Sequence, residues 1–211
     1  MRHPLYWFVR AVVAGFCRVF WRLTIDGREN LPERGSFIVA PVHRSNIDFA
    51  VVAAITKRRM RYMAKDSLWK YELGRIWEAL GAFPVHRGSA DREALRRCIE
   101  VIESGEPLVL FPEGTRQFGP EVQPLFDGAA YVAARTGVPV IPVGIGGSEK
   151  AMPKGSKMLR PVKVHVVIGK PLEPPVAEER GRVARRGVRE MTATLKAEMQ
   201  ALFDEAQRAA S

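Results

Sequence analysis

Short apolar runs rich in β-branched residues alternate with longer segments of helical periodicity along most of this chain, and that alternation limits its fold more than any other feature. The runs expected to form strands cover residues 23–25, 37–42, 61–64, 83–85, 108–111, 138–144 and 162–168. The segments expected to form helices between them cover residues 46–57, 67–80, 91–103 and 126–135. Strands joined by helices of this length build βαβ units. The pattern therefore predicts an α/β fold with a mostly parallel central sheet flanked by helices.

The C-terminal segment, residues 178–208, is charged but has an amphipathic pattern. Its apolar side chains recur at steps of three or four positions and are Val188, Met191, Leu195, Met199 and Leu202. That spacing predicts a helix that covers one face of the sheet. A length of 211 residues suits one domain of ordinary size. We therefore expect residues 24–211 to form an α/β domain with this helix as its cover.

The N-terminal segment, residues 5–23, is rich in aromatic and aliphatic side chains but is interrupted by Arg10, Arg18 and Arg22. No run in it reaches the roughly 18–20 uncharged residues of a membrane-spanning helix. On a helical wheel the three arginines lie within an arc of about 120°. The remaining surface includes Trp7, Phe8, Val12, Phe16 and Phe20. We expect residues 1–23 to form an amphipathic helix in the membrane interface; the alternative is a helix that packs on the protein's own core.

The chain is strongly basic, with 33 Lys and Arg residues against 23 Asp and Glu and a formal net charge of +10. Net charge determines which partners a protein attracts, not how it folds. Nucleic acid, an anionic bilayer and a phosphorylated small molecule all suit such a surface. Residues 57–61 and 150–160 mix cations with Met or Leu, which suits an anionic lipid surface. Ordinary solvated charge is the alternative for either segment.

The two cysteines, Cys17 and Cys98, lack the spacing of a zinc site or a disulfide framework. We expect both to be reduced packing residues. The N-terminal apolar run is broken by Arg10 and is followed by no small-residue cleavage site, so no secretory signal is expected. These features predict a protein on the cytoplasmic side of the cell membrane.

The first segment with chemical potential joins an expected strand to an expected helix and contains His43 and, five residues later, Asp48. A tight turn there brings the carboxylate back to the imidazole, where it accepts one ring N–H and leaves the other nitrogen as a base. Imidazole suits this role because it is largely neutral at pH 7. An alternative is open, since Ser45 to Asp48 also has the pattern of a helix-capping box.

Two further segments follow expected strands in the same way. Residues 111–116 read Phe-Pro-Glu-Gly-Thr-Arg, in which glycine permits close backbone approach and Arg116 offers a fork matched to phosphate oxygens. Glu113 is placed to orient that arginine or to accept from a substrate hydroxyl; a surface loop with a weak ion pair is the alternative. Residues 83–88 also place a basic residue, Arg87, before a glycine. Because carboxyl ends of parallel strands share one edge, these side chains should converge with His43.

At this point the chain resembles the glycerolipid acyltransferases, the family that includes 1-acylglycerol-3-phosphate acyltransferases. The resemblance rests on His43 and Asp48 at their spacing, on the unaltered Phe-Pro-Glu-Gly-Thr-Arg segment, and on residues 81–87 and 138–143. The four segments occur in the family's order and cover about residues 25 to 170. Four ordered segments make the resemblance specific, whereas the histidine and aspartate alone would recur by chance.

The resemblance implies that His43 deprotonates an acceptor hydroxyl, which attacks the thioester of acyl-CoA or acyl carrier protein, while Asp48 steadies the imidazole. The implied reaction acylates the sn-2 hydroxyl of 1-acylglycerol 3-phosphate (lysophosphatidic acid) and gives phosphatidic acid. Residues implied to bind the acceptor's phosphate and glycerol are Arg87, Glu113, Gly114, Thr115 and Arg116. No metal or organic cofactor is implied, because the thioester already carries an activated acyl group. The implied setting is peripheral, on the cytoplasmic face of an anionic phospholipid membrane, without nucleic acid.

Two alternatives remain at this stage. Within the same class, the acceptor is another lysophospholipid, a glycolipid or glycerol 3-phosphate. In a different class, the chain is a non-catalytic module that binds a membrane or nucleic acid through its basic charge. That module predicts that neutralising Arg58, Arg59 and Lys154 abolishes function while replacement of His43 does not.

Overall fold

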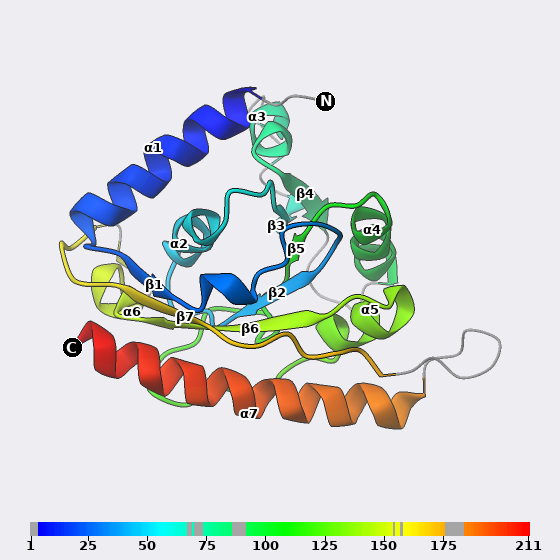
Figure 1. Ribbon diagram of the computed structural model, residues 1–211. Helices are drawn as coiled ribbons and strands as arrows, with labels where there is room; N and C mark the ends of the chain where they lie inside the picture. The colour runs from blue at the N-terminus through cyan, green and yellow to red at the C-terminus, as the bar shows by residue number, and fades with distance from the viewer. Residues whose placement is uncertain are drawn as a thin grey trace.

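The computed structural model describes residues 4–66, 69, 74–85, 92–153, 155–156, 158–175 and 184–211. Within them a seven-stranded sheet has the order β1-β7-β6-β2-β5-β3-β4 (Figure 1). The strands are β1 (Thr24–Asp26), β2 (Ile38–Pro41), β3 (Arg61–Lys65), β4 (Ala82–Val85), β5 (Leu108–Val109), β6 (Val140–Gly146) and β7 (His165–Ile168). Neighbouring strands pair in parallel except β6 with β7, which are antiparallel. The predicted α/β class with a mostly parallel sheet is confirmed.

Helices cover both faces of this sheet (Figure 1). They are α1 (Pro4–Phe20), α2 (Asp48–Ile55), α3 (Gly74–Ala79), α4 (Arg92–Glu103), α5 (Gly128–Thr136), α6 (Ser148–Ala151) and α7 (Arg185–Ala210), with a 3-10 turn at Arg28–Asn30. Helices α1 and α2 pack together on one face, and α4, α5 and α7 lie on the other. This division follows from right-handed crossovers. The chain runs from β2 through α2 toward the β4 edge and from β5 through α5 back toward the β1 edge, so the two helices lie on opposite faces.

Helix α7 packs directly on β6. Its buried stripe is Val188, Met191, Leu195, Met199, Phe203 and Ala206. The stripe thus continues through Phe203, whereas the sequence pattern predicted Leu202, which is only partly buried. Gly144 and Gly146 of β6 permit this packing, because a Cβ at either position would overlap the α7 backbone. Residues 178–183 of the predicted helix lie outside the described residues.

Helix α1 turns a narrow face to the protein and a wide apolar face outward. Tyr6, Ala14 and Cys17 are buried, and the Tyr6 hydroxyl donates to the Arg58 carbonyl at 3.4 Å. Exposed apolar residues on the helix are Leu5, Trp7, Phe8, Val12, Phe16 and Val19. Phe20, predicted on the same surface, is partly buried and packs on the core. No helix among the described residues is long and apolar enough to cross a membrane.

Both cysteines are free, buried and expected to be chemically inert. Burial raises the pKa of the Cys17 thiol to about 11 and that of the Cys98 thiol to about 12. Because the thiolate is the reactive form, neither should be alkylated by iodoacetamide in the native protein at about pH 8. Both should react after unfolding in guanidinium chloride. Mass spectrometry of the two samples checks this, and rapid labelling of native Cys98 would contradict it.

Candidate active site

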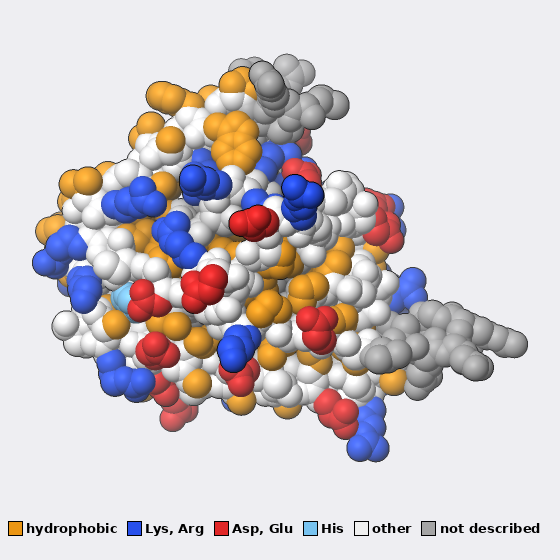
Figure 2. Space-filling view, in the orientation of Figure 1, with side chains coloured by type: hydrophobic (Ala, Val, Ile, Leu, Met, Phe, Trp, Pro, Cys, Tyr) orange, Lys and Arg blue, Asp and Glu red, His pale blue; other side chains and the backbone are white. Residues whose placement is uncertain are grey.

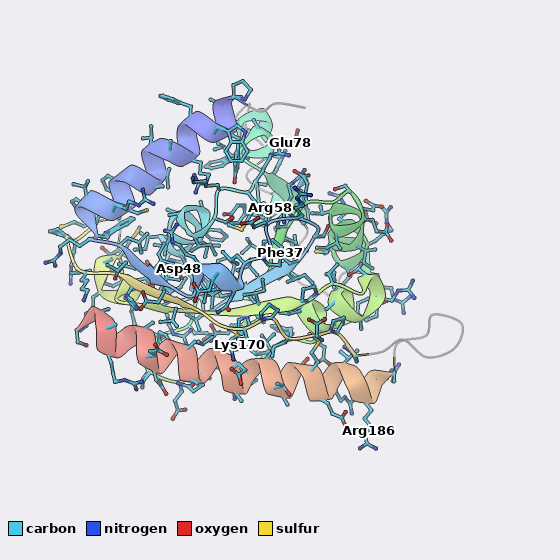
Figure 3. All side chains as sticks on the ribbon, in the orientation of Figure 1. Phe37, Asp48, Arg58, Glu78, Lys170 and Arg186 are labelled. Atoms are coloured by element: carbon cyan, nitrogen blue, oxygen red, sulfur yellow. The ribbon has the colours of Figure 1, made fainter. Side chains whose placement is uncertain are left out.

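The candidate site begins at the carboxyl end of β2, where the chain turns into α2. His43 lies two residues after β2, and Asp48 is the first residue of α2 (Figure 3). The His43 Nδ1 atom lies 3.0 Å from Asp48 Oδ2. His43 is 6% exposed and Asp48 is fully buried. The five-residue spacing thus brings the imidazole and the carboxylate into direct contact.

Asp48 holds its position through backbone donors of the same turn. Its Oδ2 atom also accepts the backbone N–H groups of Arg44 and Ser45, each at 2.7 Å. The Ser45 hydroxyl donates to the Met152 carbonyl at 2.7 Å and accepts the Ile47 backbone N–H at 3.5 Å. The bond from the Ser45 N–H to Asp48 is the acid half of the capping-box alternative, so the same carboxylate oxygen supports the start of α2 and contacts His43. The carboxylate faces the imidazole and the turn that precedes the helix.

The two ring nitrogens of the imidazole have different surroundings. Carboxylate oxygens only accept, so Nδ1 must carry the proton shared with Asp48. The other nitrogen, Nε2, then has its lone pair available, and it makes no hydrogen bond within the part of the chain that the structure describes. The ring packs on Phe111 at 4.2 Å and on Phe49 at 5.4 Å between centroids. These contacts restrict ring rotation and keep water from most of the imidazole.

The loop after β5 lies against the His43 turn. Gln117 donates its backbone N–H to the His43 carbonyl at 2.8 Å, which places Arg116 next to that turn. Gly114 adopts a left-handed conformation with φ of +71°, a region that glycine enters without strain. Thr115 is exposed and Arg116 is half-buried. The predicted convergence of the two segments is therefore present, while Arg87 lies outside the described residues.

Glu113 has a different environment from the one expected of an acceptor ligand. It is 3% exposed, and its carboxylate pairs with Arg44 at 2.8 Å inside the protein. It also accepts the backbone N–H groups of His43 at 3.0 Å and Gln123 at 3.1 Å. A carboxylate with these partners bonds to the His43 turn and to its own loop inside the protein. Sequence reasoning missed Arg44, because an arginine in a turn with His43, Ser45, Asn46 and Asp48 gives no local signal for a buried ion pair.

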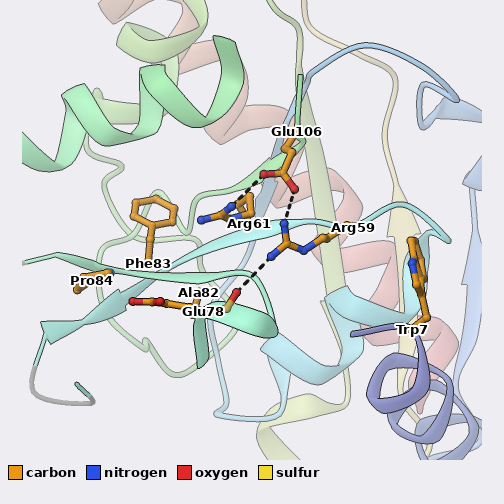
Figure 4. A pocket seen from close by; sticks show the side chains of 8 residues that line it. All are labelled: Trp7, Arg59, Arg61, Glu78, Ala82, Phe83, Pro84 and Glu106. Carbon is orange, nitrogen blue, oxygen red and sulfur yellow. Dashed lines mark hydrogen bonds and ion pairs between the residues drawn. The ribbon is translucent and has the colours of Figure 1, made fainter. Parts of the chain in front are cut away.

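A cavity of about 680 Å³ lies away from this site (Figure 4). It is lined by residues that include Trp7, Arg59, Arg61, Phe83 and Glu106. In the sheet register Arg61 pairs with Leu108 and Leu108 with Ile38. Since His43 is five residues beyond Ile38, it lies about 16 Å further along the strand direction than Arg61, at about 3.3 Å per residue. The charged lining of the cavity, Arg59, Arg61 and Glu106, is thus near the amino ends of β3 and β5, whereas the candidate site is at the carboxyl end of β2.

The basic segment 57–61 is partly neutralised at this cavity. Arg59 and Arg61 share the Glu106 carboxylate at 2.7 and 2.9 Å (Figure 4). Arg58 donates to the Pro32 carbonyl at 3.3 Å and lies over the Phe37 ring at 5.2 Å. Three of its cations therefore have partners within the protein. Among the described residues, no group of three or more His, Cys, Asp or Glu side chains is placed to hold a metal ion.

The fold and the site define a class: an α/β protein with a histidine and carboxylate pair at the carboxyl edge of a mostly parallel sheet. A family model described as Acyltransferase matches residues 22–146. The chain belongs to this acyltransferase family. The resemblance drawn from the four sequence segments is thereby confirmed.

Individual relatives agree with the family match. The chloroplastic 1-acyl-sn-glycerol-3-phosphate acyltransferase BAT2 of Brassica napus is 31% identical over 72% of this chain and 46% of its own. The 1-acyl-sn-glycerol-3-phosphate acyltransferase of Bacillus subtilis is 29% identical over 70% of this chain and 72% of its own. The crystal structure of the 1-acyl-sn-glycerophosphate (LPA) acyltransferase PlsC from Thermotoga maritima has a TM-score of 0.73 and 27% identity, covering 93% of this chain and 80% of that one. The chain spans about half the length of the plant relative.

Proposed function

We propose that this protein transfers a fatty acyl group from acyl-CoA or acyl carrier protein to the sn-2 hydroxyl of 1-acylglycerol 3-phosphate, giving phosphatidic acid. The observation that carries the proposal is the 3.0 Å contact between His43 and Asp48 beside the loop that contains Arg116. Relatives across 70% or more of the chain are named for this activity.

The chemistry follows from the free ring nitrogen. Nε2 of His43 removes the proton of the acceptor hydroxyl as its oxygen attacks the thioester carbonyl. The resulting imidazolium lies against the Asp48 carboxylate, which stabilises its charge. Collapse of the tetrahedral intermediate breaks the carbon–sulfur bond, and the imidazolium returns its proton to the departing thiolate. The products are an ester and a free thiol, and no cofactor is required.

Acceptor recognition falls to the loop after β5. A guanidinium offers two parallel donors to phosphate oxygens, so Arg116 is the residue assigned to the phosphate, together with Arg87. Gly114 and Thr115 are exposed at the same loop. Their exposed backbone is assigned to the glycerol part of the acceptor; the Phe126 ring occupies the space beside the Gly114 Cα.

Helix α1 provides the attachment to a membrane surface in this proposal. Figure 2 shows hydrophobic side chains along the outer side of α1 and Lys and Arg side chains gathered beneath it. The pKa of the Arg28 guanidinium is lowered by burial and then by the charges of Arg18 and Arg10, so these cations lie close together. An apolar helix face beside clustered cations suits a bilayer with anionic lipids. The proposed location is the cytoplasmic face of the cell membrane.

Vesicle binding tests the role of α1. Replacing Phe8 and Val12, which are 69% and 56% exposed, with aspartate should lower binding to phosphatidylglycerol vesicles. Burial of one such side chain contributes about 1.5–3 kcal/mol, so we expect the partition coefficient to fall at least about tenfold. Tyr131→Asp on α5, on the opposite face of the sheet, is the matched control. Equal sedimentation of both variants with vesicles would contradict the attachment through α1.

A thioester-release assay tests the reaction itself. Purified protein is mixed with acyl-CoA or acyl carrier protein and with lysophosphatidic acid, another lysophospholipid, a glycolipid or glycerol 3-phosphate. We expect release of the thiol with lysophosphatidic acid, and phosphatidic acid as the product by mass spectrometry. Faster turnover of another acceptor would reassign the substrate within the class. No turnover of any acceptor with either donor would reject the enzyme.

A further inference from the structure

The most heavily bonded ionic group near the site is a buried pair from two different segments. Arg44 Nη1 lies 2.9 and 2.8 Å from the two carboxylate oxygens of Glu113. The side chains are 1% and 0% exposed. Removing two charges from water is unfavourable unless hydrogen bonds replace the lost hydration. The hydrogen-bond partners of this pair therefore stabilise its two charges, and they also show which parts of the site the pair contacts.

The pair bonds to both backbone polar groups of His43, its N–H and its carbonyl. Glu113 Oε2 accepts the His43 backbone N–H at 3.0 Å, and Arg44 Nη1 donates to the His43 carbonyl at 3.2 Å. The backbone N–H of Arg44 donates to Asp48 Oδ2 at 2.7 Å. Both members of the His43–Asp48 pair are thus bonded to Arg44 or Glu113. Since Asp48 is bonded to the Arg44 backbone, a change in the ion pair reaches Asp48 through a shift of the turn that holds His43 and Arg44.

The far side of the pair is supported by the loop and by α7. Arg44 Nη2 donates to the Glu121 carbonyl at 3.0 Å, and its guanidinium lies over the Phe203 ring at 4.8 Å. Gln200 of α7 accepts the Val122 backbone N–H at 2.7 Å. The C-terminal helix is therefore connected to the His43 turn through Arg44.

We propose that Arg44 and Glu113 are positioning residues that fix the His43–Asp48 pair, and that Glu113 does not bind the acceptor. Glu113 accepts donors from Arg44, His43 and Gln123 and is almost fully buried, so a substrate hydroxyl would have to displace an internal donor. The inference rests on the proposed acyl transfer. In it, the glutamate of the Phe-Pro-Glu-Gly-Thr-Arg segment positions the base, His43, and the neighbouring residues of the segment bind the acceptor.

The two roles for Glu113 predict opposite kinetics. In Glu113→Gln the side-chain amide places a donor where the carboxylate accepted, so the His43 turn must shift. Because displacement of a reacting group by 1 Å reduces rates up to about 100-fold, we expect kcat to fall about tenfold and the KM for lysophosphatidic acid to stay within about twofold. A role as acceptor ligand predicts the reverse, with a raised KM and a kcat near that of the wild type.

Phe203→Leu provides a milder test that keeps both charges. It removes the aromatic face under Arg44 and retains an apolar core side chain. Positioning through Arg44 predicts a kcat lowered about threefold to tenfold, since a cation–π contact of this kind is modest, with KM unchanged. A direct contact between Glu113 and the acceptor gives no reason for a change in kcat. Arg44→Lys should also lower kcat, because lysine lacks the planar guanidinium that bonds both Glu113 and the Glu121 carbonyl.

A spectroscopic readout tests the inference independently of the reaction. The Nδ1 proton shared by His43 and Asp48 is expected to give a low-field proton NMR signal in the wild type. We expect this signal to broaden or disappear in Glu113→Gln and to weaken in Phe203→Leu, at temperatures below the melting transition of each. An unchanged signal with unchanged kcat in both variants would overturn the positioning role. If the wild type fails to transfer acyl groups, the NMR result still decides the inference while the proposed function fails.

Discussion

Replacing His43 with alanine is expected to lower kcat about 10²–10⁴-fold, the usual contribution of a general base. No other described side chain pairs with Asp48 as this imidazole does, so no neighbour takes over its role. A water molecule entering the space would accept a proton far less readily than an imidazole. Thiol release from acyl-CoA at saturating lysophosphatidic acid measures the change.

The His43→Ala variant should remain folded. Asp48 keeps its two backbone donors from Arg44 and Ser45, so its buried charge is still bonded. The loss should be about 1.5–3 kcal/mol of unfolding free energy, as for one hydrogen bond to a charged group. Thermal unfolding followed by circular dichroism checks this value.

His165 offers a matched control for that variant. It is also 6% exposed and bonded on both sides, to Thr24 at 2.6 Å and to Asp26 at 3.4 Å. It lies on β7, with partners on the edge strand β1, so His165→Gln should retain activity. Comparable losses in both variants would show that the effect of His43→Ala is structural.

A comparison of His43→Ala with a variant that neutralises three cations separates the enzyme from a non-catalytic basic module. The module requires that His43→Ala retain function and that neutralising Arg58, Arg59 and Lys154 remove it. Arg59 is bonded to Glu106 and Arg58 lies over Phe37, so these two cations serve the fold. Their replacement should lower stability first, which a melting curve would reveal.

The sequence predicted the layout of the fold because local patterns determine it. β-Branched runs and helical periodicity depend on neighbours along the chain, and βαβ handedness then fixes which edge the loops share. Boundaries were less accurate: β5 ends at Val109, and Phe111 belongs to the loop where it packs on His43. Such packing depends on partners distant in sequence, which periodicity does not contain.

The same distinction applies to the candidate site. The contact between His43 and Asp48 follows from one tight turn, so a five-residue spacing was enough to anticipate it. The partner of Glu113 is Arg44, 69 positions away, and no local pattern specifies that pair. The sequence therefore predicted that Glu113 lies near the site, but it did not predict which side chains Glu113 contacts.

Asp48→Asn should separate the charge of the carboxylate from its geometry. All three donors to Asp48 reach Oδ2, and the buried Oδ1 has no partner among the described residues. An asparagine with its carbonyl oxygen at the Oδ2 position therefore accepts from the same three groups, and His43 keeps its tautomer. The amide nitrogen then replaces the unpartnered oxygen, at a cost of about 1–3 kcal/mol for a buried unsatisfied donor.

What this variant loses is the negative charge against the imidazolium that forms during the reaction. A hydrogen bond to a charged partner contributes about 1.5–3 kcal/mol, so we expect kcat to fall up to about 100-fold, with an unchanged KM for lysophosphatidic acid. Asp48→Ala, which leaves three donors without an acceptor, should lower the melting temperature far more than Asp48→Asn does. Steady-state kinetics and melting curves of both variants test the assignment. Wild-type kcat in Asp48→Asn would mean that Asp48 only orients the ring, because that variant retains the orientation and removes the charge.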